Sequence, residues 1–372
     1  MRIEPFAMER MQSTWENLVD YDMSESGVRP LTLRELAAMG LDLDALLDTP
    51  LGYSQSNGTL ELREALAALY PSATVDHIEV TNGSSEANYV VALSLLDPGD
   101  RVAIQVPNYM QLPGLVRSLG AQLETFRLLP DQGWQPDWDQ FHRAVSPGAK
   151  LVYLSNPHNP TGSVLSPGAM RRIADRCAEV GAWLLSDEVY QGAEIDSPRT
   201  PSFWGMGERI IINSGLSKAY GIPGVRIGWI AAPPALIAQC WSQHDYITIG
   251  PNKLSDRIAR FAVAHREQCF ARTRSILQHN LPIARQWIAS FEGFLQWSEP
   301  TAAAISLVRY QASIPSTTLA EDIRIRQSTL IVPGAMLGLE SHLRIWIGGR
   351  EDYLREGLRR IGLELNRHRS PG

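Results

Sequence analysis

The feature that most constrains this fold is a repeated alternation of short apolar runs with longer helical segments between about residue 76 and residue 230. Such an alternation predicts βαβ units, because parallel strands are joined by crossover connections that are usually helices. Several runs, such as the one over 210–212, are too apolar for half-exposed strands and indicate strands covered on both faces. We therefore expect an α/β large domain with a mostly parallel, seven-stranded sheet, its strands near 77–80, 101–105, 122–126, 151–154, 183–185, 210–212 and 227–230.

The pattern changes after about residue 250. Longer helices follow, then apolar runs at 304–308 and 343–347 and a closing amphipathic segment over 351–366. This mixture predicts a smaller α+β domain. We expect residues 1–45 to form an N-terminal arm and part of the small domain, residues 46–265 to form the large domain, and residues 266–372 to form the rest of the small domain.

Composition narrows the class of protein. The 372 residues are 44% hydrophobic and 20% charged, as in folded globular chains, and the net charge of −6 provides no basic surface for nucleic acid or an anionic membrane. We expect a small-molecule substrate and neither nucleic acid nor membrane as a partner. The three cysteines are widely spaced, which predicts no metal site and a reducing, cytoplasmic compartment. The N-terminus lacks the apolar region of a signal peptide, and no apolar run reaches the ~20 residues of a membrane span.

Polar segments follow two of the predicted strands, where ligands of parallel sheets bind. The segment 81–86 places Ser84 and Ser85 at the start of a helix, whose free N–H groups suit a phosphate. A plain helix N-cap is the alternative for Ser84. The segment 155–162 holds two Asn-Pro steps and includes Asn159. It is more constrained than a chance loop, and a turn stiffened by proline is its alternative interpretation.

Two further strand ends carry a carboxylate and a lysine. Asp187 lies at the tip of an apolar run, where a buried carboxylate needs a cation to stay ionised, although helix capping is also possible there. Lys218 lies among Ser, Gly and Tyr residues, and Arg226 follows eight residues later. The chain has three lysines, and the other two, Lys150 and Lys253, open a strand and a helix as solvated residues would. Lys218 is therefore the candidate reactive amine.

In this order and spacing, these four segments resemble the class I/II aminotransferases, pyridoxal 5′-phosphate (PLP) enzymes of fold type I. The resemblance extends from the block at 51–63 to the segment 343–345. It implies that Lys218 forms the Schiff base with the cofactor aldehyde and shuttles the proton of the substrate Cα. It also implies that Asp187 pairs with the pyridinium nitrogen.

The same resemblance assigns the other cofactor contacts. It places Asn159 and Tyr190 at the ring oxygen, Tyr109 on the ring face, and Ser84, Ser85, Ser217 and Arg226 at the phosphate. One departure is visible, since the family often has a phosphate-binding serine where this chain has Gly215.

Substrate and subunit contacts are implied in the same way. Arg344 matches the arginine that binds the substrate α-carboxylate, with Asn159 beside it and the backbone of Gly27 closing over. Tyr53 matches a tyrosine that reaches the phosphate of the neighbouring subunit. The resemblance therefore implies a homodimer with shared active sites.

The N-terminal residues bear on the reaction. Segments 22–28 and 51–54 resemble the capreomycidine-synthase-like branch, which cyclises hydroxylated arginine. The arm also carries four acids without a lysine to neutralise them, namely Glu4, Glu9, Asp22 and Glu25. Carboxylates there could bind a guanidinium, and we favour Glu9 and Glu25 for this role. The alternative is that these acids are solvated or paired with Arg2 and Arg10.

The expected activity is the dehydration and cyclisation of a hydroxylated arginine to a cyclic guanidino amino acid of the enduracididine or capreomycidine type. An aminotransferase that passes an amino group to a 2-oxo acid is the alternative enzyme. A transcription regulator with the PLP-enzyme fold is a third possibility, but the chain has no spare residues for the basic helix-turn-helix such proteins add.

Overall fold

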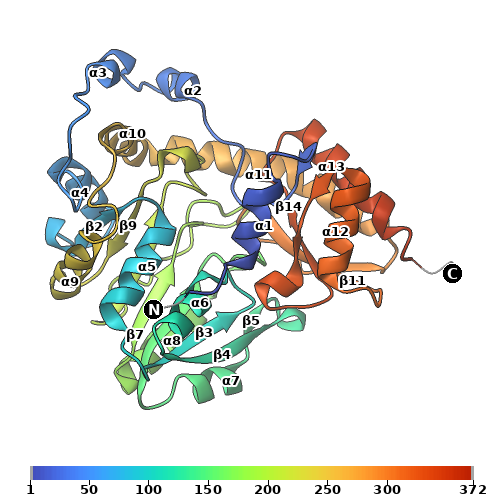
Figure 1. Ribbon diagram of the computed structural model, residues 1–372, viewed down its shortest axis with the longest axis horizontal. Helices are drawn as coiled ribbons and strands as arrows, with labels where there is room; N and C mark the ends of the chain where they lie inside the picture. The colour runs from blue at the N-terminus through green and yellow to red at the C-terminus, as the bar shows by residue number, and fades with distance from the viewer. Residues whose placement is uncertain (1–2, 370–372) are drawn as a thin grey trace.

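The computed structural model describes residues 3–369, and its large domain is built on one mixed sheet (Figure 1). The strand order is β2-β9-β8-β7-β6-β3-β4-β5. Neighbours from β8 to β4 pair in parallel, whereas β9 is antiparallel to both β2 and β8, and β5 is antiparallel to β4. The strands span Ile78–Thr81 (β2), Arg101–Val106 (β3), Gln122–Leu129 (β4), Gln135–Pro136 (β5), Ala149–Ser155 (β6), Trp183–Asp187 (β7), Ile210–Gly215 (β8) and Gly228–Ala231 (β9).

The seven predicted strands are all present, and the sheet is mostly parallel as expected. An eighth strand, β5, extends one edge by two residues. The sequence pattern gives no sign of it, because two residues cannot show an alternation. Its pairing depends instead on the return of the chain after the 3-10 turn η2, Pro130–Gln132.

Helices cover both faces of this sheet, which explains why the central parts of its inner strands are largely apolar. Ile211 of β8 packs in the cluster formed with helices α5, α6 and α9, while Ile210 and Ile212 pack in the cluster on the opposite face. Successive side chains of a strand point to opposite faces, so both faces need apolar residues. The covering helices include α4 (Leu60–Ala67), α5 (Ser84–Leu95), α6 (Gln111–Ser118), α7 (Trp138–Ala144), α8 (Pro167–Val180), α9 (Pro234–His244) and α10 (Lys253–Ala264).

The smaller unit has a four-stranded antiparallel sheet in the order β10-β11-β14-β13. The predicted strands and closing helix appear there as β11 (Ile305–Tyr310), β14 (His342–Trp346) and α13 (Glu351–Leu365). Its other elements are α11 (Arg266–Ala289), β10 (Leu295–Trp297), α12 (Ser316–Gln327), β12 (Thr329–Leu330) and β13 (Val332–Pro333). β1 (Tyr21–Asp22) pairs in parallel with β12, so the N-terminal segment contributes to this unit. The exact domain bounds stay a prediction.

Helix α1 (Ala7–Trp15) lies where the two units meet, as Figure 1 shows for the dark blue helix between the green and orange elements. Met8 is buried against Leu128 of β4, Leu307 of β11 and Val332 of β13. This packing holds the polar side of α1 above the carboxyl ends of the large sheet. In residues 3–369, no helix has both the length and the apolar character needed to cross a bilayer.

Candidate active site

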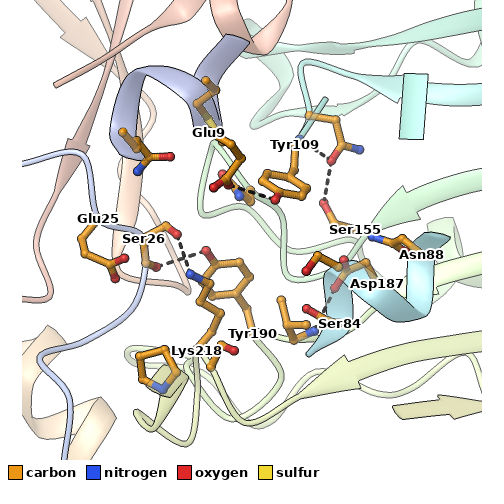
Figure 2. Close-up of a pocket in the computed structure, with 18 of the residues that line it drawn as sticks. Glu9, Glu25, Ser26, Ser84, Asn88, Tyr109, Ser155, Asp187, Tyr190 and Lys218 are labelled. Carbon is orange, nitrogen blue, oxygen red and sulfur yellow. Dashed lines mark hydrogen bonds between the residues drawn. The ribbon is translucent and has the colours of Figure 1, made fainter. Parts of the chain in front are cut away.

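A cavity of about 310 Å³ lies between the carboxyl ends of the large sheet and helix α1 (Figure 2). Eleven of the fourteen residues selected from the sequence line it: Glu9, Glu25, Ser84, Ser85, Tyr109, Asn159, Asp187, Tyr190, Ser217, Lys218 and Arg226. The other three, Gly27, Tyr53 and Arg344, do not. Strand ends that lie far apart in the chain thus converge on one site, as expected for a sheet of this type.

Lys218 follows β8 and enters the cavity from one side. Its Nζ donates a hydrogen bond to Ser26 Oγ at 2.7 Å. The phenol of Tyr190 donates to the carbonyl of Ser26 at 3.1 Å, so one residue of the N-terminal arm contacts both side chains. This contact places the amine of Lys218 in the interior of the site.

Asp187 ends β7 and is buried, with 7% of its surface exposed. One carboxylate oxygen accepts from the Val189 N–H at 3.2 Å, and the other accepts from Asn213 Nδ2 at 3.3 Å and Tyr153 Oη at 3.5 Å. Burial raises the pKa of Asp187 to about 6, although the hydrogen bonds from Val189 and Tyr153 and the charge of Lys218 oppose the shift. Within residues 3–369 no cation pairs with it. A protonated ring nitrogen in the cavity would satisfy this carboxylate.

The opposite part of the cavity suits an anion. Ser84 and Ser85 begin α5, whose first N–H groups have no partners within the helix. Arg226 donates to the carbonyls of Pro223 (3.0 Å) and Asn82 (3.4 Å) and, among residues 3–369, to no carboxylate. Gly83 has φ +99°, and a Cβ there would collide with the Arg226 guanidinium. The glycine thus lets the arginine approach the helix start, where a phosphate would be held by charge-assisted hydrogen bonds.

Gly215 occupies the position at which the sequence departs from the family pattern. A Cβ at residue 215 would lie 3.1 Å from the Ile227 carbonyl oxygen and 3.3 Å from Gly228 Cα. Strands β8 and β9 therefore approach closely beside the start of α5, and a larger residue would separate them. Ser217 lines the cavity and Ser214 does not, so Ser217 is the hydroxyl that remains for an anion on this side.

Tyr109 forms the wall next to the N-terminal helix. Its ring meets Phe6 edge-on with centroids 5.0 Å apart, and its hydroxyl donates to Glu9 Oε1 at 2.9 Å. Burial, reinforced by the negative charge of Glu9, raises the pKa of the Tyr109 phenol. Tyr109 is therefore neutral, and its contacts with Phe6 and Glu9 fix its ring as one wall of the cavity, against which a bound ring could stack.

Arg344 lies behind the cavity rather than in its wall. It is 1% exposed, it donates to Asn159 Oδ1 at 3.2 Å and to the Ser24 carbonyl, and its Nε has no partner. No carboxylate pairs with it in the described part of the chain. Gly27 is also outside the wall, and its carbonyl accepts from Trp346 Nε1. The arm segment 24–27 thus covers the position predicted to bind the substrate carboxylate, and the arginine keeps a nitrogen without a partner.

Acidic side chains of the N-terminal arm gather at the cavity. Glu9, Glu16 and Glu25 line it, and no ion pair joins any of them to another residue of the segment 3–369. Burial and the neighbouring carboxylates raise the pKa of Glu16, whereas the charge of Lys218 and two backbone N–H groups outweigh burial and lower the pKa of Glu25. Glu4, by contrast, pairs with Arg117 at 3.1 Å and lies outside. Arg10 pairs with none of these acids, and Arg2 lies outside the described residues.

Several lining residues were not selected from the sequence: Gln12, Glu16, Ser26, Asn88, Asn108, Tyr153 and Ser155. A signal existed for Asn88, which lies one helical turn after Ser84 and therefore faces the same side of α5. Ser26 gave no signal, because its role depends on how the arm folds back over Lys218.

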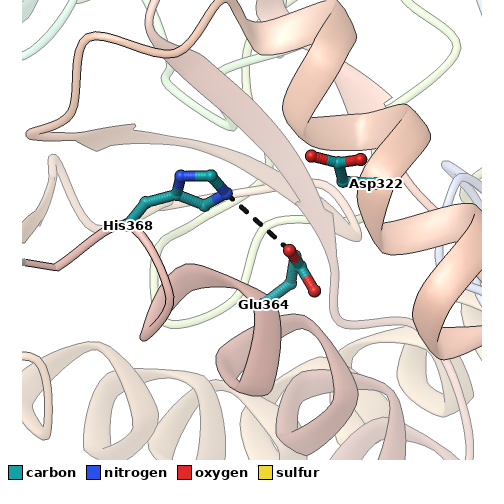
Figure 3. A group of neighbouring side chains, drawn as sticks. All are labelled: Asp322, Glu364 and His368. Carbon is teal, nitrogen blue, oxygen red and sulfur yellow. Dashed lines mark ion pairs between the residues drawn. The ribbon is translucent and has the colours of Figure 1, made fainter.

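Tyr53 is 93% exposed and lines a separate hollow with Asn82, Thr248 and Lys253. Away from both hollows, Asp322, Glu364 and His368 bring their ligand atoms together between α12 and α13 (Figure 3). Glu364 forms ion pairs there with Arg326 at 3.0 Å and Arg367 at 3.3 Å. Since these arginines already neutralise the carboxylate, we assign this cluster to packing between the two helices.

Comparison with known proteins places these features in context. The model of the family described as aminotransferase class I and II matches residues 32–361. Capreomycidine synthase from Streptomyces vinaceus is 32% identical over 355 residues, which are 93% of this chain and 90% of that protein. A PLP-dependent aminotransferase from Streptococcus suis 89-1591 is 29% identical, with a TM-score of 0.93 over 100% of both chains. The PLP-dependent cyclase OrfR, in complex with Au, is 28% identical, with a TM-score of 0.91 over 99% of both chains. The expected fold type I is confirmed.

The burial of Asp187 predicts a pH-dependent stability of protein stripped of small molecules. Its folded-state pKa of about 6 lies above the ordinary value of 3.8, so the stabilisation from its protonated form is present at low pH and is lost as pH rises through about 6. Asp187→Asn should therefore gain up to roughly 3 kcal/mol relative to wild type between pH 4 and 7.5. Urea unfolding across this range measures the difference, with Asp131→Asn on the surface as control. If the free energy of unfolding changes with pH in the same way for wild type and Asp187→Asn, the raised pKa assigned to Asp187 is wrong.

Proposed function

Since this chain belongs to the class I and II aminotransferase family, we propose that it is a PLP-dependent enzyme that dehydrates and cyclises a hydroxylated arginine. The product would be a cyclic guanidino amino acid of the enduracididine or capreomycidine type. One observation carries the proposal: the cavity that contains Lys218 is bordered by Glu9, Glu16 and Glu25 of the N-terminal arm. Similarity to capreomycidine synthase and to a PLP-dependent cyclase supports it.

The residues present fit the cofactor. Arg226, Ser84, Ser85 and Ser217 would hold its phosphate, and the buried Asp187 carboxylate would pair with its ring nitrogen. Tyr109 would cover the ring face, while Asn159 and Tyr190 would donate to the ring oxygen. When bound, PLP supplies an aldehyde that reacts with amines and a ring that accepts the electron pair of the Cα–H bond.

Lys218 is the group we assign to moving the Cα proton. Its Nζ contacts Ser26 Oγ, so the arm holds the amine on the inner side of the cavity. The carboxylate of Glu25 is half-buried, and its Oε2 accepts from the Gly27 N–H at 3.2 Å. That hydrogen bond fixes a negative charge at the side of the cavity formed by the arm, where it can attract a guanidinium.

The proposed reaction balances without an oxidant. A proton leaves Cα, and for a hydroxyl on Cγ a second proton leaves Cβ. The hydroxyl then departs as water, and a guanidine nitrogen gives up a proton as it forms a bond to the carbon that lost the hydroxyl. A proton returns to Cα and, in the Cγ case, to Cβ. The net change is the loss of one water. A hydroxyl on Cβ leads to a six-membered ring, and a hydroxyl on Cγ leads to a five-membered ring. A carboxylate that holds the guanidinium also sets which of these carbons the nitrogen can approach.

An aminotransferase is the second candidate. The family model and the structure from Streptococcus suis favour it, because both describe aminotransferases. It would use the same Lys218 and Asp187, so the cofactor site does not separate the two activities. They differ in whether a 2-oxo acid must accept the amino group.

The two activities are separated by incubating PLP-loaded enzyme with hydroxylated arginine in the absence of any 2-oxo acid. We expect repeated turnover to a product that is lighter by one water, measured by mass spectrometry. Lys218→Ala should abolish turnover, because only a primary amine at this position can react with the cofactor and carry the proton. Lys150→Ala, which changes a lysine on the surface, is the matched control. A single turnover that resumes only when a 2-oxo acid is added would establish the aminotransferase instead.

The carboxylates of the arm should select for positive charge. Glu25→Gln should weaken binding of hydroxyarginine about 10- to 100-fold, the effect of losing a hydrogen bond between charged groups. Glu9 is exposed and already accepts the Tyr109 hydroxyl, so Glu9→Gln should weaken it by only about threefold. Absorbance titrations of loaded enzyme measure both. Citrulline derivatives, which lack the positive charge, should bind the variants and the wild type with the same affinity. Glu4→Gln, on the same arm but outside the cavity, is the control and should leave the affinity for hydroxyarginine unchanged. If the wild type binds acidic or small apolar amino acids more tightly than hydroxyarginine, the proposed selection for positive charge is wrong.

We also propose a homodimer with shared sites. Tyr53 lies outside the cavity of its own chain, and Leu47, Leu51, Tyr53 and Tyr246 are 82–93% exposed. Exposed apolar groups of this size indicate a surface that a partner covers. Sedimentation should give a dimer, and Tyr53→Phe should keep the dimer while weakening PLP binding about tenfold. A fully active monomer would contradict both the dimer and the role of Tyr53.

A further inference from the structure

A buried Glu–His–Glu cluster lies behind the start of α5. His244 ends α9 and is fully buried; its Nδ1 lies 2.8 Å from Glu79 Oε1 on β2, and its Nε2 lies 3.1 Å from Glu86 Oε2 on α5. None of the three residues lines the cavity. One imidazole therefore joins a strand and a helix of the large domain at a point that the proposed chemistry does not use.

The charges of this cluster depend on one another. Burial opposes the charged imidazole, but the hydrogen bonds and charges of Glu79 and Glu86 outweigh it and raise the pKa of His244 to about 9. Burial raises the pKa of Glu79 to about 7, while hydrogen bonds from His244, Asn82 and Thr248 outweigh burial and lower that of Glu86 to about 2. Removing the imidazole would leave two buried carboxylates without their shared partner.

Glu86 connects the cluster to the anion-binding turn. Its Oε2 accepts from the backbone N–H of Asn82 and from Asn82 Nδ2 at 3.0 Å. The carbonyl of Asn82 in turn accepts from Arg226 at 3.4 Å, and Gly83, the next residue, packs against the same guanidinium. A shift of Glu86 would therefore move both the turn before Ser84 and the arginine that faces it.

We propose that His244 is a positioning residue: by bridging Glu79 and Glu86, it holds the turn at residues 82–85 in the shape that binds the phosphate of the cofactor. This inference rests on the proposed function, because the phosphate belongs to PLP. It adds a residue that never touches the ligand and that the family resemblance does not assign. Ordinary core packing by His244 would stabilise the fold but would not distinguish a phosphorylated ligand from an unphosphorylated one.

The groups that face the cluster are few. Thr248 Oγ1 donates to Glu86 Oε1 at 2.7 Å and lies 3.1 Å from His244 Nε2. The charge of Arg63 on α4 lowers the pKa of Glu79, and that of Asp245 raises it. Of the groups that face His244, the carboxylates it bridges are the only ionisable ones in hydrogen-bond contact with the ring among residues 3–369.

The test compares PLP with pyridoxal, which lacks the phosphate. Both are titrated into cofactor-free full-length protein and binding is measured by absorbance. His244→Ala should raise the dissociation constant of PLP about tenfold and leave that of pyridoxal within about twofold. Asn280→Ala removes a buried side chain that donates two hydrogen bonds in the small domain, and it controls for general destabilisation. An equal loss for both ligands, or no loss for PLP, would overturn the proposal.

His244→Gln provides a second variant if His244→Ala does not fold. In wild type, the preference for PLP over pyridoxal should fall as pH rises through about 9, because the imidazole then loses its proton. Lys218 reacts with the aldehyde of both ligands, so its contribution to binding cancels in this ratio. The fall should be absent from His244→Gln. A fall of the same size in both proteins would contradict the proposal, while a wild type that binds neither ligand would instead defeat the proposed function.

Discussion

The whole site depends on the burial of the large sheet on both faces. Ile210, Ile211 and Ile212 alternate between two apolar clusters, so neither face of β8 can carry a polar group at low cost over these residues, and its polar residues come at its end. Chemistry is thereby restricted to the strand ends, where the helix covering stops. Asp187 ends β7, and Lys218 follows the end of β8. A single packing constraint thus brings a carboxylate and an amine from different parts of the chain to one edge.

Charge is distributed unevenly around that edge. Arg226 and the start of α5 form a positive region for an anion, whereas Asp187, buried and without a cation among residues 3–369, forms a region that a positive ring nitrogen would satisfy. The two regions define the orientation of a ligand that carries opposite charges at its ends. This arrangement explains why the same cofactor site can serve both a cyclase and an aminotransferase, since the electron-accepting chemistry lies in the cofactor.

The N-terminal arm forms the remaining wall of the cavity. Packing of Met8 against residues of both sheets holds α1 over the cavity, and Ser26 reaches Lys218 from the same arm. The arm contributes carboxylates but, within residues 3–369, no cation to neutralise Glu9, Glu16 or Glu25. The acidic wall of the cavity therefore comes from a segment that is separate in sequence from the strand ends near Asp187 and Lys218.

The sequence by itself determined the seven main strands, the closing helix and most of the candidate residues that line the cavity. These follow from apolar periodicity and from motifs whose members are close together in the chain, as with Ser84 and Ser85 before α5. Only the tertiary structure decided the contacts made across long separations. Ser26 accepts a hydrogen bond from Lys218, and the Ser24 carbonyl accepts one from Arg344. Glu16 joins the wall of the cavity, and His244 lies against Glu86. Such contacts depend on how distant segments pack, and periodicity records only which face of an element is buried, not what lies against it.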